Sequence, residues 1–265
     1  MTKLAYIGGY GRSGSTLLEY LLTVHPEIVA CGEVKRHLRR FGRRKTCTCG
    51  SIMKDCPVWS PFQHKKGKLK GWDHEQLTPA LLEHVSPDYA VMIDSSKTAW
   101  GTLLAPFRLR RRLGKDLLLV HLVRDPRGVC WSVMRTTRPP TKARKNLPAS
   151  LRAALGWTWA NLASEMFGRL YPTQYVRLRY EDIVRARGDI IGEVLKRLDL
   201  RPPPDLDTLE SYDNRHQLYG NTMRFRELSE LKEDVEWRTS MPTGARRMVT
   251  VLCWPLGAMY GYFGS

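Results

Sequence analysis

A glycine-rich stretch near the start of the chain constrains the fold more than any other feature. Residues 4–7 are apolar and two glycines follow them, which predicts a buried strand that ends in a turn. Residues 15–22 then place four leucines on one face of a helix. Backbone amides of such a turn converge on an anion at the helix N-terminus, and Arg12 adds a fixed positive charge. The stretch therefore predicts a site for a phosphate-like group.

The order of strand, loop and helix then recurs along the chain. Further apolar runs predict strands at residues 89–94, 117–123 and 174–179, and helices are predicted at residues 75–85, 98–112 and 150–171. This alternation is typical of a three-layer α/β fold with a parallel sheet, here with a P-loop-like start and a helical C-terminus. Ligands of such sheets bind at the carboxyl ends of the strands, so the polar residues there should converge on one edge. These residues are Arg12, Lys97, Arg124 and Tyr180.

Length and composition suit one globular domain. The chain has 265 residues, of which 42% are hydrophobic, and this is enough to bury a sizeable core. We therefore expect a single domain over residues 1–265. Residues 46–71 carry three cysteines and little periodicity, so we expect them to form an insert or lid over one face of the domain.

The charge of the chain predicts an anionic partner. The net charge is +17, which favours a nucleotide, a nucleic acid, an acidic glycan or a membrane surface. No apolar run reaches the ~20 residues of a transmembrane segment. The first apolar run is short and lacks the cleavage site of a signal peptide. We therefore expect a cytoplasmic protein without a transmembrane segment.

Three of the six cysteines form a cluster, Cys47, Cys49 and Cys56. A cytoplasmic location argues against disulfides. The spacing of the cluster is not that of a zinc finger, and no fourth ligand is obvious, although His37 and His64 are available. The sequence leaves open whether these cysteines bind zinc, pair with one another or stay reduced.

The loop at residues 9–16 departs from the phosphate loop of nucleoside triphosphatases. That motif needs a lysine between a glycine and a hydroxyl residue, and here Ser15 and Thr16 follow Gly14 directly. No acidic residue in the loop is placed to hold magnesium. A dinucleotide-binding pattern fits the glycines only weakly, because Arg12 lies inside the turn. The loop therefore predicts an anion site that holds no metal.

Two segments resemble the sulfotransferases that use 3′-phosphoadenosine 5′-phosphosulfate (PAPS). Residues 11–18 (GRSGSTLL) are similar to the loop that holds the 5′-phosphosulfate in that family. Residues 123–128 (VRDPRG), with Ser132 eight residues after Arg124, resemble its 3′-phosphate segment. The resemblance implies that Arg124 and Ser132 bind the 3′-phosphate. In the loop it implies six donor-binding residues: Gly11, Arg12, Ser13, Gly14, Ser15 and Thr16.

Three weaker similarities extend the match over most of the chain. Residues 180–182 (YED) are similar to a family segment whose tyrosine contacts the adenine, which implies this role for Tyr180. Residues 220–224 (GNTMR) resemble a GNPMR stretch of glycan-specific and bacterial members, which implies that Asn221 and Arg224 belong to the donor site. The cysteine segment at residues 47–59 resembles an insert of bacterial members.

The resemblance implies transfer of a sulfuryl group from PAPS to a hydroxyl or amine of a small-molecule, lipid or glycan acceptor. Adenosine 3′,5′-bisphosphate (PAP) is then the second product. Such a reaction needs charge stabilisation on the leaving phosphate and a base for the acceptor. Arg12 suits the leaving 5′-phosphate, and Lys97 suits the bridging oxygen, as a lysine in a similar place does in the family.

Glu33 is the expected base. Steroid and phenol members carry a catalytic histidine two residues after the lysine, and here Ala99 occupies that position. Carbohydrate members often use a carboxylate at a distance after the loop comparable to that of Glu33. His37 is the second candidate, and a salt bridge from Glu33 to Lys35 or Arg36 is the structural alternative.

Two other functions are weighed against this one. A nucleotide or small-molecule kinase would use the same scaffold, but the missing lysine argues against it. A basic nucleic-acid-binding protein would explain the net charge of +17, but it gives no reason for polar residues at four strand ends. We therefore expect no nucleic-acid partner.

Overall fold

The computed structural model describes residues 2–39, 46–63, 71–99, 101–136, 148–203, 214–219, 225 and 232–263. Within these ranges, five parallel strands form one sheet in the order β2-β3-β1-β4-β5. The strands are β1 (Lys3–Gly8), β2 (Ile28–Ala30), β3 (Val91–Asp94), β4 (Leu117–Val123) and β5 (Tyr175–Arg179). The parallel sheet confirms the predicted α/β fold class.

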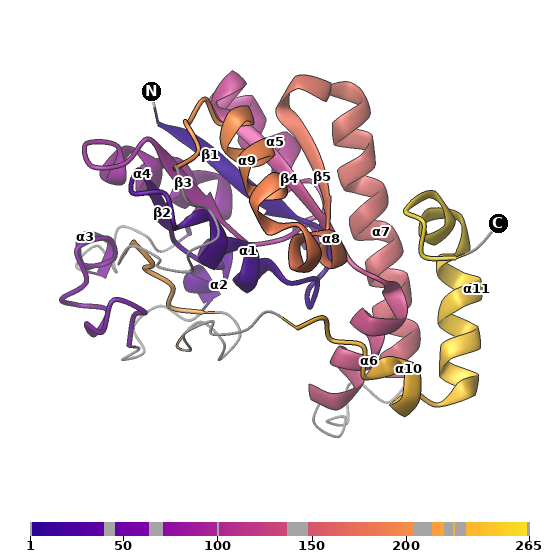
Figure 1. Cartoon of the computed structure of the whole chain (residues 1–265). Helices are drawn as coiled ribbons and strands as arrows, with labels where there is room; N and C mark the ends of the chain where they lie inside the picture. Colours follow the sequence, from indigo (N-terminus) through magenta and orange to yellow (C-terminus); the bar gives the residue numbers. More distant parts are fainter. Residues whose placement is uncertain are drawn as a thin grey trace.

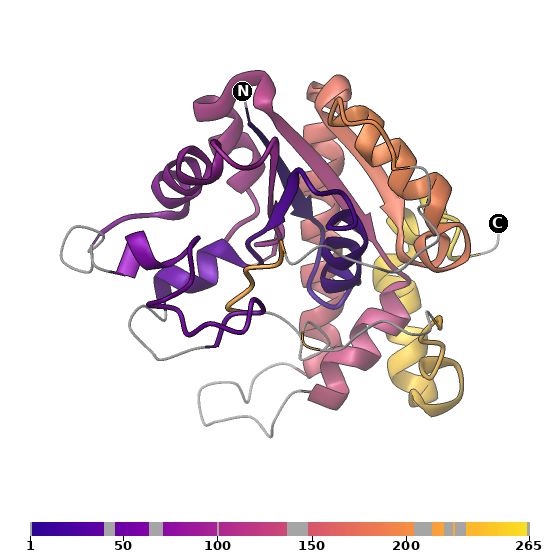
Figure 2. The ribbon, with the colours of Figure 1, turned by 60° about the vertical axis from the view of Figure 1, so that its left-hand side comes forward.

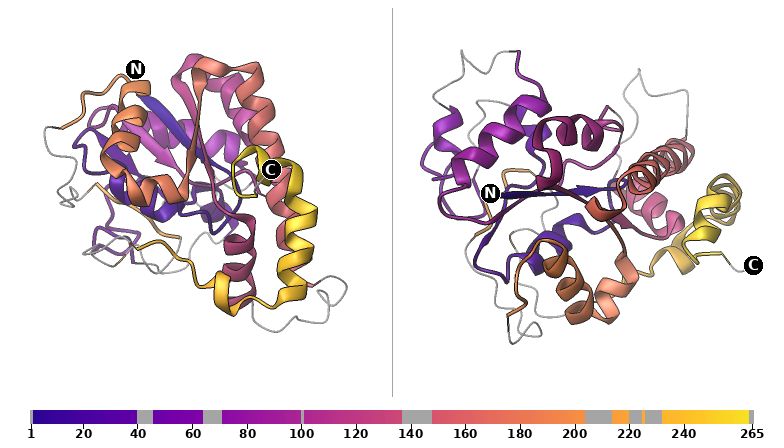
Figure 3. Two further views of the ribbon diagram at one scale, coloured as in Figure 1. Left: turned by 45° about the vertical axis from the view of Figure 1, so that its right-hand side comes forward. Right: turned by 90° about the horizontal axis from the view of Figure 1, so that it is seen from above.

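Helices cover both faces of this sheet (Figure 1; Figure 3, right). One face carries α1 (Ser15–Leu22), α8 (Tyr180–Arg185) and α9 (Arg187–Arg197). The other carries α4 (His74–Val85), α5 (Ala105–Leu113) and the upper part of α7 (Ala149–Leu170). Shorter elements are α2 (Val34–Arg39), α3 (Ser60–Gln63), η1 (Gly114–Asp116) and η3 (Pro172–Gln174). The molecule therefore has the expected three layers.

Alternation along the strands divides the core into two layers. Leu4 and Tyr6 of β1 pack on the α4 and α5 side, whereas Ala5 and Ile7 pack on the α1 and α9 side. All residues of β4 are buried, as expected of a parallel strand that is covered on both faces. Strand β1 lies between β3 and β4, so the glycine-rich loop that follows it emerges near the middle of the sheet edge.

A third core cluster lies beyond the sheet, between the lower part of α7 and the last helices. Here α6 (Pro126–Thr136), α10 (Trp237–Ser240) and α11 (Thr243–Met259) pack together around the buried Trp157. Helix α11, near the C-terminus, packs on α6 and α7. No helix within the described ranges has the length and apolar character needed to span a membrane.

The described part of the predicted insert, residues 46–63, packs into the core. Cys47, Met53, Trp59 and Phe62 are buried in the same cluster as α4. Residues 64–70 lie outside the described residues. Figure 2 shows this segment beside residues 214–219, which come from much later in the chain.

One strand was missed, and one predicted helix begins several residues later than expected. Strand β2 was not predicted, because three apolar residues alone do not distinguish a strand, and it is defined by its pairing with β3. The helix predicted from residue 98 begins only at Ala105, where Pro106 occupies the first turn. Thr98 instead binds the glycine-rich loop: its Oγ1 accepts a hydrogen bond of 2.8 Å from the Gly9 N–H.

Candidate active site

The loop between β1 and α1 can be built only with glycine at two places. Gly9 has a φ of 96°, and a Cβ there would lie 2.2 Å from the carbonyl oxygen of Leu122 in β4. Gly14 has a φ of 97°, and a Cβ there would lie 2.6 Å from the Tyr180 ring. The loop is therefore pressed against the ends of β4 and β5, where the other predicted site residues follow.

This loop leaves donors unused at the start of α1. Gly14 is the N-cap residue and supplies no side chain, and the first helical bond runs from the Leu18 N–H to the Gly14 carbonyl. The helix itself therefore does not use the N–H groups of its first residues. Ser13 Oγ is buried and has no hydrogen-bond partner among the described residues. Such a set of unsatisfied donors suits an anion.

Gly14→Ala is expected to damage this loop. The substitution places a Cβ in a left-handed conformation and against the Tyr180 ring, which together should cost about 2–4 kcal/mol of unfolding free energy. Thermal unfolding measures the loss. The matched control is Gly244→Ala in α11, where nothing lies within 4 Å of an added Cβ and stability should change little. A Gly14→Ala variant as stable as the control would contradict the packing described here.

Arg124, directly after β4, joins the loop to the end of β5. Its guanidinium donates to the carbonyl of Arg12 at 3.1 Å and lies 4.5 Å from the centre of the Tyr180 ring. It also pairs with the Asp234 carboxylate at 3.1 Å, and the Asp234 N–H donates to the Tyr180 hydroxyl at 3.4 Å. Only 6% of Arg124 is exposed. Arg124 therefore connects the glycine-rich loop, the Tyr180 ring and the segment before α10 in one network.

Helix α6 reaches the same network through its last turn. Arg12 donates to Thr136 Oγ1 at 3.1 Å, and that hydroxyl donates to the carbonyl of Ser132 at 2.7 Å. Ser132 lies two turns into α6 and is buried. The structure thus brings Arg12, Arg124 and Tyr180 together at the carboxyl edge of the sheet, and Ser132 is linked to them through its backbone carbonyl.

Lys97 and Glu33 form an ion pair beside the same loop. Lys97 Nζ lies 2.6 Å from Glu33 Oε1, and a Cβ added at Gly11 would lie 4.0 Å from Lys97 Cδ. The Lys97 carbonyl accepts a hydrogen bond of 2.5 Å from the Tyr6 hydroxyl. Lys97 and Arg12 both have a positive φ, of 67° and 74°. Such a backbone is uncommon outside glycine and clusters at functional sites.

The second oxygen of Glu33 pairs with Arg36 at 3.0 Å. Burial alone raises the pKa of Glu33, but Lys97 and Arg36 outweigh it, and the pKa lies below its ordinary value. The ion pair with Arg36, which the sequence analysis gave as the structural alternative to a catalytic base, is therefore present. Lys35 instead donates to the carbonyl of Gly101. Glu33 is ionised at neutral pH and faces the lysine.

His37, the second candidate base, lies in the core. Its ring centre is 4.5 Å from that of Trp59, and no part of the residue is exposed. Burial lowers the pKa of His37 to about 4, so the ring is neutral near pH 7. Its packing against the insert does not suit a base that must meet an incoming acceptor. Asn221 and Arg224, which the resemblance assigned to the donor, lie outside the described residues.

Glu19 is a residue that sequence reasoning missed. It lies on α1, only 2% of it is exposed, and its carboxylate accepts a hydrogen bond from Gln217. Burial raises the pKa of Glu19 to about 7 against the opposing effects of Ser95, Lys97 and Gln217. The sequence carries no signal for this burial, because Glu19 lies off the leucine face of α1 and its partner Gln217 comes 198 residues later.

The raised pKa of Glu19 predicts a pH-dependent stability. Between about pH 4.5 and pH 7 the folded chain holds a proton on Glu19 that the unfolded chain has released, so the contribution to stability is lost as the pH rises through 7. Glu19→Gln removes this loss. Relative to the unsubstituted chain, the variant should gain on the order of 3 kcal/mol between pH 5 and pH 8.

Chemical unfolding at several pH values measures this gain. Glu83→Gln on the exposed surface of α4 is the control for the loss of one carboxylate from the chain. A constant difference between Glu19→Gln and the unsubstituted chain across this range would show that Glu19 does not titrate there.

Comparison with known proteins gives the fold a context. No protein-family model and no curated protein matches the sequence. Among solved structures, the sulfotransferase domain of the Synechococcus PCC 7002 olefin synthase matches with 20% identity over 99% of this chain and 95% of its own, with a TM-score of 0.61. The sulfotransferase domain of the curacin biosynthetic pathway matches with 17% identity over 100% and 99% of the two chains, with a TM-score of 0.64.

A sulfotransferase from Alicyclobacillus acidocaldarius also matches, with 14% identity over 100% of this chain and 97% of its own and a TM-score of 0.50. The chain has the fold of these sulfotransferase domains. Identities this low establish the shared fold alone. On this fold, the Arg12–Arg124 network and the Lys97–Glu33 pair both lie beside the glycine-rich loop.

Proposed function

We propose that this chain, as one domain, is a cytoplasmic sulfotransferase of bacterial type that transfers the sulfuryl group of PAPS to a hydroxyl or amine. The observation that carries the proposal is the network of Arg124. This buried arginine joins the loop that resembles the 5′-phosphosulfate site to the strand end that resembles the 3′-phosphate site. A nucleotide with phosphates at both positions needs two such anion sites one nucleoside apart.

Each part of the donor has a partner in this proposal. The unused amides at the start of α1, Ser13 Oγ and Arg12 bind the 5′-phosphosulfate. Arg124 and Ser132 bind the 3′-phosphate. The Tyr180 ring, which lies between Arg124 and Gly14, contacts the adenine. Binding then uses fixed backbone donors, the buried Arg124 and the exposed Arg12, a set that suits an anion in a partly desolvated site.

The Lys97–Glu33 pair supports a route for the acceptor proton. The acceptor oxygen or nitrogen attacks sulfur, the bond from sulfur to the 5′-phosphate oxygen breaks, and Glu33 takes the acceptor proton. Lys97 leaves Glu33 and stabilises the charge on the bridging oxygen. Glu33 then loses a cationic partner that lowers its pKa, and burial makes it a stronger base at the moment when the proton is released.

The acceptor is a small molecule, a lipid or a glycan. A panel of such acceptors, incubated with radiolabelled PAPS, tests the proposal directly. We expect labelled product and PAP to form in equal amounts with at least one acceptor class, without added magnesium. Magnesium-dependent transfer from ATP would favour a kinase on the same scaffold. Binding only to DNA or RNA, with a steep dependence on salt, would favour a nucleic-acid-binding protein.

A further inference from the structure

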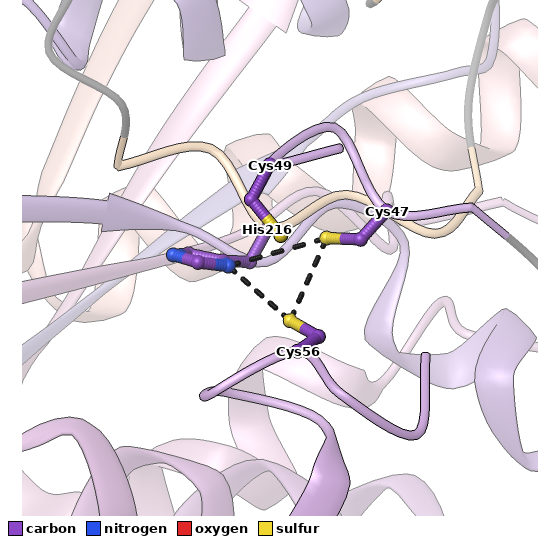
Figure 4. A group of neighbouring side chains, drawn as sticks. All are labelled: Cys47, Cys49, Cys56 and His216. Carbon is purple, nitrogen blue, oxygen red and sulfur yellow. Dashed lines mark hydrogen bonds between the residues drawn. The ribbon is translucent and has the colours of Figure 1, made fainter. Parts of the chain in front are cut away.

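The three clustered cysteines and a distant histidine gather at one point. Ligand atoms of Cys47, Cys49, Cys56 and His216 all lie within 4.8 Å of one another (Figure 4). Cys47, Cys56 and His216 are buried, and Cys49 is half-buried. His216 was not singled out from the sequence. Of the histidines named there, His37 packs on Trp59 and His64 lies outside the described residues.

The distances in this group fit a tetrahedral metal site. Cys47 Sγ and Cys56 Sγ are 3.6 Å apart, and His216 Nδ1 lies 3.3 Å from Cys56 Sγ and 4.0 Å from Cys47 Sγ. Tetrahedral zinc with ordinary bond lengths places two sulfurs about 3.8 Å apart and a sulfur and a nitrogen about 3.6 Å apart. The Cys47, Cys56 and His216 atoms need to move by only a few tenths of an ångström to meet these values. Cys49 Sγ, which lies within 4.8 Å of the other three, needs to move by up to about 1 Å.

We propose that Cys47, Cys49, Cys56 and His216 bind one structural zinc ion. Three thiolates and an imidazole are soft and borderline ligands, and a tetrahedral arrangement of them selects zinc over magnesium or calcium. Four protein ligands also fill the coordination shell, so no position is left for water or substrate. The ion therefore has a structural role, apart from the sulfuryl-transfer chemistry.

Backbone hydrogen bonds hold the ligand-bearing segments in place without the side chains. The Cys47 N–H donates to the Ser51 carbonyl at 2.8 Å and so closes a turn over residues 47–51. This turn places the side chains of Cys47 and Cys49 near each other. The His216 N–H donates to the Ala30 carbonyl at 2.7 Å, which adds residues 214–219 to the end of β2. When a site is largely preformed, less of the free energy of metal binding is offset by the cost of ordering the chain.

The metal ties two distant parts of the chain together. Thr48 Oγ1 donates to the Arg215 carbonyl, and Trp59 Nε1 donates to the His216 carbonyl at 2.6 Å. The same segment carries Gln217, whose side chain donates to Glu19 on α1. Zinc would thus anchor residues 214–219 between the insert and the helix that follows the glycine-rich loop (Figure 2).

Metal analysis of the full chain tests this site. The protein is purified with its tag removed, in a reducing buffer and without chelator, and its metals are measured by plasma mass spectrometry. We expect one zinc per chain. We also expect Cys56→Ser and His216→Ala to lower the zinc content severalfold. Cys130→Ser, a buried cysteine outside the group, is the matched control and should retain one zinc per chain.

A second measurement covers variants that fail to fold. Zinc in the unsubstituted chain is replaced by cobalt, and the intense visible bands of tetrahedral cobalt with thiolate ligands are recorded. Removal of zinc by a chelator should also lower the midpoint of thermal unfolding by several degrees. Three results would overturn the proposal: a chain without stoichiometric zinc, a Cys47–Cys56 disulfide in its place, or a cobalt spectrum without thiolate bands.

Discussion

Replacing Arg124 by alanine is expected to abolish the preference of the chain for PAP over AMP. The two nucleotides differ by a 3′-phosphate, which in our account binds Arg124 and Ser132. Loss of a buried cation that pairs with a phosphate should weaken PAP binding about 10²- to 10³-fold. AMP binding should change much less, so the ratio of the two affinities should approach one. Isothermal titration calorimetry measures both.

This ratio separates a binding role from a structural one. Arg124 also holds the Arg12 carbonyl and Asp234, so the variant will be less stable. A general loss of structure would weaken the binding of PAP and of AMP to the same extent. Arg177→Ala on β5, which breaks an ion pair with Glu165, is the matched control and should leave both affinities unchanged. An Arg124→Ala variant that still prefers PAP over AMP would exclude Arg124 from the 3′-phosphate site.

Glu33→Gln is expected to stop sulfuryl transfer without preventing donor binding. The amide keeps the size of the side chain but cannot take the acceptor proton. Loss of a positioned base should lower kcat about 10²- to 10⁴-fold. The dissociation constant of PAP should change little, because Glu33 does not touch the donor phosphates in our account. Steady-state transfer to the acceptor found in the panel, together with PAP titration, measures the two effects.

The competing role for Glu33 is an ion pair that only supports Lys97 and Arg36. In that case Glu33→Gln would lower thermal stability and leave kcat intact. Glu165→Gln is the control, because this acid also pairs with an arginine and is largely buried. It should reduce stability and leave transfer unchanged. A Glu33→Gln variant that behaves like Glu165→Gln would remove Glu33 from the mechanism.

The fold was largely predictable because its strongest signals are local. Six apolar residues and one histidine define β4, and the glycines at residues 8, 9 and 14 mark the loop without any tertiary information. Strand β2 is only three residues long, and only its hydrogen-bonded pairing with β3 makes it a strand. The late start of α5 likewise follows from a tertiary contact, because Thr98 binds the loop through Gly9.

The sequence predicted those residues of the candidate site that directly follow a strand. Arg12, Lys97, Arg124 and Tyr180 do lie at one edge of the sheet, as the parallel pattern required. Asp234 and Glu19 were missed because their partners are distant in the sequence: Glu19 and Gln217 are 198 residues apart. The pairing of His216 with Cys56, 160 residues earlier, was hidden for the same reason.

The central claim is that the loop and Arg124 together form a site for a nucleotide with phosphates at the 3′ and 5′ positions. Thermal shift with PAP, AMP and magnesium ATP tests it most directly, because a ligand that binds the folded chain raises its unfolding midpoint. Our account predicts a clear rise with PAP, a smaller one with AMP and none that depends on magnesium. No rise with PAP, or a larger and magnesium-dependent rise with ATP, would contradict it.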